Sequence, residues 1–322
     1  MEYGHLGRTG LKVSRIALGC MSYGDTSRGF NQWSLDEESS QPFFKQAVEL
    51  GITLWDTANV YQQGSSEEFV GRAMTRYARR EEIVVATKVS GPMHGGPGGQ
   101  GLSRAAILEQ IDASLTRLGT DYIDLYLIHR FDTETPVEET MEALHDVVKA
   151  GKARYLGASS MYAWQFAKMQ HAADLHGWTR FVAMEDQYNL IKREEEREML
   201  PMCLDMGVGA IPYSPLGKGR VTRPWGHQTQ RSELDAVAKS FDLDIDRPVV
   251  DAVEKIAEER RVPMAQVALA WVLSKPVVAA PIVGATKPRH LSDAVAALDI
   301  ELTQDEIRRL EERYTPQSPY WW

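Results

Sequence analysis

Cysteine is scarce in this sequence, and what the chain lacks excludes several classes of protein. Only two cysteines occur, Cys20 and Cys203, and they share no CxxC spacing. We therefore expect neither a disulfide framework nor a thiolate metal site. The sequence has no run of about 18 apolar residues, and its first residues, MEYGHLGRTG, have no apolar core of signal-peptide length. We expect a protein of the reducing cytoplasm that neither enters nor spans a membrane.

Basic residues are also outnumbered. The 322 residues include 36 lysines and arginines against 45 aspartates and glutamates, which gives a formal net charge of -9. Because no basic stripe is available to offset phosphate repulsion, a nucleic-acid partner is not expected. A hydrophobic content of 43% is enough for a large core, and we expect a single domain over residues 1–322. The oligomeric state is left open by the sequence.

Short apolar, β-branched segments recur along the chain, with helical patterns between them. Their spacing, roughly 30 to 40 residues for most, is long enough for one strand and one crossover helix. Eight such units predict an α/β protein with a (β/α)8 TIM barrel. The eight segments begin near Ile16, Thr53, Ile83, Ile123, Arg154, Phe181, Gly209 and Val277.

Three further local features can be predicted. Residues Leu6 to Val13 are expected to form a short hairpin that closes the barrel floor. Ser65 stands three residues before Glu68, which is the spacing of a helix capping box. The stretch from Leu216 to Asp246, after the seventh strand, is the longest segment without clear periodicity. We expect it to form a long loop that covers a ligand.

Four ionisable residues stand at or just after predicted strands. Asp56 ends the second strand, Tyr61 follows five residues later, Lys88 ends the third strand and His129 ends the fourth. Barrel enzymes carry their reactive groups at the carboxyl ends of the strands, so these side chains are expected to converge. Taken singly, each has an ordinary interpretation, as a turn or cap residue or as part of the structure.

Taken together, the four residues predict proton chemistry. A lysine at the mouth of an apolar barrel is costly unless it is paired, and Asp56 supplies the counter-charge for Lys88. The ammonium group would also stabilise a tyrosinate and lower the pKa of the Tyr61 phenol from about 10. His129 could donate a hydrogen bond to a carbonyl oxygen on which negative charge develops. This chemistry requires no metal ion.

These residues and their surroundings resemble a known family. The stretch DTANVYQQGSSEEFVG, the lysine of VATK and the histidine of LYLIHR resemble the Asp, Tyr, Lys and His tetrad of the aldo-keto reductase superfamily. The resemblance extends over nearly the whole chain, including LGRTGLKVSRIALGCMSYG, GKARYLGASS, QYNLIKREEEREMLP, IPYSPLGKGRVT and PIVGATKPRHL. It implies a reductase of aldehydes and ketones in which a nicotinamide cofactor supplies hydride and Tyr61 donates the proton.

The resemblance also implies a set of cofactor-binding residues. Ser159 and Gln187 match positions that hold the nicotinamide carboxamide, and Tyr213 matches an aromatic ring that stacks on nicotinamide. The remaining matches lie in the pyrophosphate loop and in the loop that holds the adenosine end. These are Ser214, Leu216 and Gly219 in the first loop, and Gly284, Ala285 and Thr286 in the second.

The resemblance favours NADPH over NADH. Five cationic residues are candidates for binding a 2′-phosphate, although surface salt bridges explain each of them equally well. They are Arg220, Arg223, Lys287, Arg289 and His290. The sequence departs from the family at Ser160, where many relatives carry asparagine, and at residues 290–294, where QLxEN is replaced by HLSDA. Both departures weaken the prediction of adenine contacts and of an NADPH preference.

Some interpretations remain open at this point. Several aromatic residues could line an apolar substrate pocket or could pack in the core or at a subunit contact; they are Tyr23, Trp33, Trp225, Tyr320, Trp321 and Trp322. A cofactor-sensing regulatory subunit with slow turnover is the alternative to a metabolic enzyme. A metal-dependent barrel hydrolase is a more distant alternative, because no HxH spacing stands at a strand end.

Overall fold

A computed structural model describes residues 1–29, 31–227 and 243–318 of the chain. Eight parallel strands form one sheet in the order β10-β3-β4-β5-β6-β7-β8-β9, and each strand lies beside its neighbour in sequence. The strands are β3 (Ala17–Gly19), β4 (Leu54–Asp56), β5 (Val84–Val89), β6 (Ile123–Ile128), β7 (Ala153–Ser159), β8 (Phe181–Glu185), β9 (Gly209–Ala210) and β10 (Ile282–Gly284).

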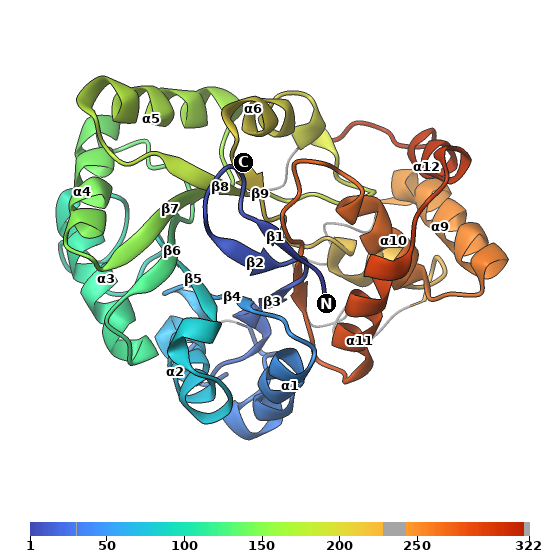
Figure 1. Ribbon diagram of the computed structural model, residues 1–322, viewed down its shortest axis with the longest axis horizontal. Helices are drawn as coiled ribbons and strands as arrows, with labels where there is room; N and C mark the ends of the chain where they lie inside the picture. Colours follow the sequence, from blue (N-terminus) through green and yellow to red (C-terminus); the bar gives the residue numbers. More distant parts are fainter. Residues whose placement is uncertain (30, 228–242, 319–322) are drawn as a thin grey trace.

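Backbone hydrogen bonds close this sheet into a ring. The amide of Ala210 in β9 donates to the carbonyl of Val277 at 2.9 Å, and the amide of Ile282 in β10 donates to the carbonyl of Pro212 at 2.9 Å. Helices surround the ring (Figure 1), so the predicted (β/α)8 barrel is confirmed. The helices are α1 (Glu37–Glu49), α2 (Ser65–Tyr77), α3 (Arg104–Leu118), α4 (Val137–Lys149), α5 (Ala163–His176), α6 (Met199–Met206), α9 (Arg247–Arg260), α10 (Met264–Leu273), α11 (Arg289–Ala296) and α12 (Gln304–Glu311).

The strands divide their side chains between two cores. In β6, Leu125 and Leu127 belong to the cluster inside the barrel, whereas Tyr126 and Ile128 pack with the helices outside. This alternation follows from the two-residue period of a strand. The barrel interior is also narrow, and small residues such as Ala86 occupy it beside the leucines.

The predicted hairpin is present, with different bounds. Its strands are β1 (Tyr3–His5) and β2 (Lys12–Ser14), so much of the predicted segment from Leu6 to Val13 forms the connecting turn. Leu6 and Val13 are fully buried in the interior cluster. The amide of Arg8 donates to the carbonyl of Gly207, just before β9, so the hairpin closes the amino end of the barrel (Figure 1). The carboxyl ends of the strands are left uncovered by this hairpin.

Two further local predictions differ from the structure. The eighth strand is expected from Val277 but begins only at Ile282, directly after Pro281, which has no amide proton for a ladder. The capping box is absent: Gly64, with φ 87°, is the N-cap of α2, and the Ser65 hydroxyl donates to the carbonyl of Gln62 at 2.8 Å.

The structure describes only part of the long segment after β9. Short 3-10 turns cover Gly217–Thr222 and Asp244–Asp246. Residues 228–242, on which the prediction of a ligand-covering loop mainly falls, lie outside the described residues. Over the part of the chain that the structure describes, no helix combines the length and the apolar character needed to span a bilayer.

Candidate active site

The four ionisable residues predicted from the sequence meet at the carboxyl ends of β4, β5 and β6. Asp56 is the last residue of β4, Lys88 precedes the last residue of β5, and His129 directly follows β6. The Lys88 ammonium nitrogen lies 2.6 Å from Oδ1 of Asp56 and 3.5 Å from the hydroxyl of Tyr61. The Tyr61 and His129 rings meet edge to face, with centroids 5.7 Å apart. The convergence expected from strand order is therefore present.

Tyr61 is held by an unusual turn. It opens a 3-10 segment, Tyr61–Gly64, in which Gln62 and Gln63 have left-handed backbones with φ of 47° and 51°. Such conformations cost of order 1–3 kcal/mol each when other contacts do not favour them. The Gln62 side chain is fully buried, and its amide group donates to the carbonyls of Asn31 at 3.2 Å and Asp25 at 3.3 Å. These bonds anchor the turn and so fix where the phenol points.

Lys88 is fully buried and surrounded by oxygen atoms. Its ammonium group contacts both carboxylate oxygens of Asp56, at 2.6 and 2.8 Å, and the carbonyl of Thr57 at 3.0 Å. A second carboxylate, Glu185, lies 3.2 Å away. Burial alone lowers the pKa of Lys88, but the two carboxylates together raise it above its ordinary value. Lys88 is therefore a cation at neutral pH.

Glu185 is not among the site residues predicted from the sequence. It is the last residue of β8, so the same rule that singles out Asp56 at the end of β4 could have identified it. Glu185 also pairs in register with Ser159 at the end of β7. The carboxyl group thus reaches Lys88 from the far side of the barrel.

The ionisation of Tyr61 differs from the expectation of a lowered pKa. Burial raises the pKa of the phenol above 10, and the opposing charge of Lys88 does not outweigh it. The phenol is therefore protonated at neutral pH and has a proton to give. Burial, with Lys88 and Arg130 nearby, holds the pKa of His129 well below its usual range. A neutral imidazole at this position can still donate one N–H hydrogen bond.

The other half of the barrel mouth carries the residues predicted to hold nicotinamide. Ser159 is buried at the end of β7, and its hydroxyl donates to the carbonyl of Glu185 at 2.7 Å. The hydroxyl of Ser160, the departure noted above, donates to the Tyr213 hydroxyl at 3.3 Å. Tyr213 also forms an isolated bridge with Gln187. Ser160 and the bridge thus fix the orientation of the Tyr213 ring.

The loop predicted to meet the pyrophosphate has an open, left-handed backbone. Ser214, Gly217, Lys218 and Gly219 have φ of 50°, 55°, 53° and 89°. Two internal hydrogen bonds shape it: Gly217 N donates to Ser214 O at 2.9 Å, and Gly219 N donates to Leu216 O at 2.8 Å. Glycine adopts such angles freely and lets a ligand approach the backbone closely.

The residues predicted to hold the adenosine end follow β10. Gly284 ends the strand, and the carbonyl of the buried Ala285 accepts a hydrogen bond from the Tyr23 hydroxyl at 2.9 Å. The amide of Thr286 donates to Nδ1 of His290 at 3.3 Å. Together with the loop after β9, these residues line the β9 and β10 side of the mouth.

The five cationic candidates fall into different environments. Arg220 is buried, and Arg223 donates to the carbonyl of His227 at 2.8 Å. Lys287 and Arg289 are exposed at the start of α11, where no carboxylate of a described residue forms an ion pair with them. These two side chains are the best placed to meet a dissolved anion.

Most of the described aromatic residues that were candidates for a substrate pocket pack against other apolar side chains. Tyr23 is fully buried and stacks on Phe43 with centroids 5.9 Å apart, so it belongs to the core. Trp225 is partly buried against the apolar cluster that contains Trp271, and Trp33 is partly buried. Tyr320, Trp321 and Trp322 lie outside the described residues.

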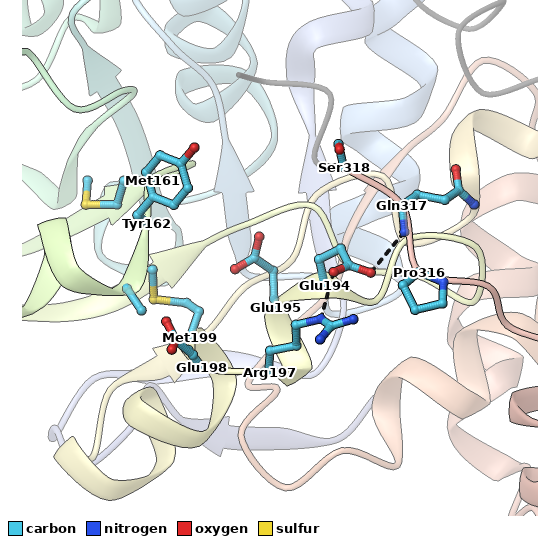
Figure 2. A pocket seen from close by; sticks show the side chains of 11 residues that line it. Met161, Tyr162, Glu194, Glu195, Arg197, Glu198, Met199, Pro316, Gln317 and Ser318 are labelled. Carbon is cyan, nitrogen blue, oxygen red and sulfur yellow. Dashed lines mark hydrogen bonds and ion pairs between the residues drawn. The ribbon is translucent and has the colours of Figure 1, made fainter.

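A pocket of about 660 Å³ opens beyond β7 and β8 (Figure 2). Met161 and Tyr162 line one side, and the segment before α6 lines the other with Glu194 and Glu195. Glu194 accepts hydrogen bonds from Arg197 at 2.9 Å and from the amide of Gln317 at 3.1 Å. Burial, with Asp186 and Glu194 nearby, raises the pKa of Glu195 to about 9. The mouth therefore carries a further buried acid, away from Lys88.

No group of three or more histidine, cysteine, aspartate or glutamate side chains among the described residues could hold a metal ion.

Comparison with known proteins gives a consistent result. A family model described as Aldo/keto reductase family matches residues 15–315. Versiconal hemiacetal acetate reductase of Aspergillus parasiticus is 46% identical to this chain, and the alignment covers 99% of this chain and 98% of that protein. An aldo-keto reductase of Metarhizium robertsii is 42% identical, and the alignment covers 98% of this chain and 92% of that protein. A Saccharomyces cerevisiae protein, provisionally named an aryl-alcohol dehydrogenase, is 40% identical, and the alignment covers 97% of this chain and 96% of that protein.

Proposed function

Since the chain belongs to the aldo/keto reductase family, and is thus an NAD(P)H-dependent oxidoreductase acting on small carbonyl compounds, we propose that it reduces aldehydes and ketones with NADPH and with Tyr61 as the acid. One observation carries the proposal. The hydroxyl of a buried, protonated tyrosine lies 3.5 Å from an ammonium group that a carboxylate grips through both oxygens.

Tyr61 delivers the proton of the reaction. As hydride reaches the carbonyl carbon, the carbonyl oxygen gains negative charge and takes the phenol proton, which yields the alcohol and a phenolate. Lys88 stabilises this phenolate across 3.5 Å, and solvent then returns a proton to Tyr61. The neutral imidazole of His129, edge-on to the same ring, orients the carbonyl oxygen by donating a hydrogen bond.

The residues around the second half of the mouth fit a nicotinamide cofactor. A reduced nicotinamide supplies the hydride when bound. Nε2 of Gln187 and Oε2 of Glu185 are buried and have no hydrogen-bond partner among the described residues. A carboxamide group brings one acceptor and a donor pair that would satisfy both. Ser159 and Tyr213 complete this wall, and the left-handed loop around Gly219 suits a pyrophosphate.

The proposal predicts a direct activity. The purified protein is expected to oxidise NADPH in the presence of an aromatic aldehyde and to release the alcohol, as followed by nicotinamide absorbance and product chromatography. Aromatic aldehydes are chosen because one relative is named after aryl alcohols. A single slow turnover on a tightly held nucleotide would instead favour the regulatory alternative. Inhibition by chelators would contradict the proposed chemistry.

The exposed cations beside α11 predict the cofactor preference. Replacing Lys287 or Arg289 by alanine is expected to raise KM for NADPH by about tenfold, because each would lose a charge-assisted hydrogen bond to the 2′-phosphate. KM for NADH, which lacks that phosphate, should not change. Lys168→Ala removes an exposed lysine of α5 and serves as the control. Equal effects on both cofactors would rule out this phosphate site.

A further inference from the structure

Two carboxyl groups contact one ammonium group inside this barrel. Asp56 approaches Lys88 from β4 and Glu185 from β8, and all three side chains are nearly or fully buried. If both acids were ionised, the cluster would hold two negative charges against one positive charge. An unbalanced charge in a dry interior is costly, and a carboxyl group in that position neutralises by keeping a proton.

The contacts identify which acid keeps the proton. Asp56 meets the ammonium group through both oxygens, at 2.6 and 2.8 Å, whereas Glu185 meets it through Oε1 alone, at 3.2 Å. The carboxyl groups of Glu185 and Asp56 also form a hydrogen bond with each other, which favours the proton on Glu185. The shorter, two-point contact stabilises the charge of Asp56 more strongly.

We propose that Glu185 is a positioning residue of the reductase, held as a neutral acid against Asp56 and Lys88, and that its ionisation sets the alkaline limit of carbonyl reduction. The proposal rests on the reductase function proposed above. Glu185 acts through Lys88: when Glu185 is neutral, the ammonium group has a single counter-charge and stabilises the Tyr61 phenolate fully. A second negative charge beside Lys88 weakens that stabilisation.

Burial and the charge of Asp56 raise the pKa of Glu185 to about 8, against the opposing effect of Lys88. The titratable groups that interact with Glu185 are Asp56 from β4, Lys88 from β5 and Tyr61. Cys20 and His129 interact with Lys88. Burial raises the pKa of Tyr61 and Cys20, the carboxylates raise that of Lys88, and the pKa of His129 is well below its usual range. None of these four ionises together with Glu185.

The ionisation of Glu185 also raises the pKa of Tyr61, because the added negative charge opposes a phenolate. Tyr61 then becomes a weaker acid toward the substrate. With rising pH, kcat for reduction is expected to fall by about three- to tenfold across the Glu185 titration.

The proton can be observed without cofactor or substrate. In protein labelled with carboxyl-13C glutamate, NMR should show two glutamates that titrate in the alkaline range, Glu185 and Glu195, whereas aspartates such as Asp186 carry no label. The Glu195→Gln variant removes one of these signals. The remaining signal, with a midpoint near the value of about 8 given for Glu185, is the expected result. Its absence would overturn the proposal, even if the enzyme reduces carbonyls.

The second measurement is the dependence of kcat on pH in three proteins. Wild type and Glu195→Gln should share the alkaline decline, since Glu195 is a buried acid that makes no contact with Lys88. Glu185→Gln preserves the shape of the side chain and cannot ionise, so its kcat should stay level over that range. An unchanged decline in Glu185→Gln would overturn the proposal. If Glu185→Gln does not fold, the NMR titration of labelled wild type and Glu195→Gln still tests whether Glu185 keeps a proton into the alkaline range.

Discussion

Replacing Tyr61 by phenylalanine is expected to lower kcat for carbonyl reduction by about 10²–10⁴-fold, the range that general acid catalysis supplies. The change removes only the hydroxyl that lies 3.5 Å from the Lys88 ammonium group. The ring remains to pack edge-on against His129. Cofactor affinity, measured by fluorescence titration, should therefore stay close to wild type while turnover collapses.

A matched control is available in the same barrel. Tyr126 in β6 is fully buried, and its hydroxyl makes no hydrogen bond to a described residue. Tyr126→Phe removes a phenol hydroxyl from the outer core and should leave kcat unchanged. If Tyr61→Phe kept the wild-type rate, Tyr61 would not be the proton donor and the proposed mechanism would be wrong.

Replacing Lys88 by methionine has the largest expected effect on stability. The variant leaves Asp56 and Glu185 buried without their cation, and loss of one partner of a buried ion pair costs about 3–5 kcal/mol. We expect the free energy of unfolding, measured in urea, to fall by that amount near neutral pH. Turnover should fall by about 10²-fold or more, because the Tyr61 phenolate loses its stabilising charge.

The stability defect of Lys88→Met should depend on pH. Without the ammonium group, burial raises the pKa of both acids in the folded state above their unfolded values, so the folded protein binds protons more tightly. The variant is therefore most stable below the ordinary carboxyl pKa of about 4 and loses stability as pH rises through the raised values. A defect that grows toward acid pH would contradict this account.

Arg117 provides the control for charge burial alone. It pairs at 2.6 Å with Glu67, a fully buried residue in the first turn of α2. Arg117→Met should destabilise the fold to a comparable extent but leave the turnover of the folded enzyme near wild type. Equal loss of turnover in both variants would mean that Lys88 has only a structural role.

The sequence predicts the barrel well because each strand can be recognised from a few consecutive residues. Apolar segments rich in isoleucine or valine, such as IVVATK at residues 83–88, are buried on both faces of the sheet. They can be recognised in the sequence without knowledge of a distant partner. The same holds for the candidate site, since Asp56, Lys88 and His129 each stand where a strand ends. Strand order then brings them together without knowledge of the side chains.

What the sequence does not predict depends on contacts between distant segments. The left-handed turn after Tyr61 is held by bonds from the Gln62 side chain to the distant carbonyls of Asp25 and Asn31, and no capping pattern reveals it. The raised pKa of Tyr61 depends on how completely the mouth is buried. Glu185 stands at a strand end, as the other candidates do, but its contact with Lys88 joins residues about a hundred positions apart and leaves no local pattern.

The central claim is that hydride reaches a carbonyl carbon while Tyr61 supplies the proton. The most direct test follows NADPH that carries deuterium on the transferred position, with an aromatic aldehyde, by mass spectrometry of the product. Wild type should place the deuterium on the former carbonyl carbon, and Tyr61→Phe should bind the same cofactor and form almost no product. An alcohol formed without deuterium, or formed equally fast by Tyr61→Phe, would contradict the account.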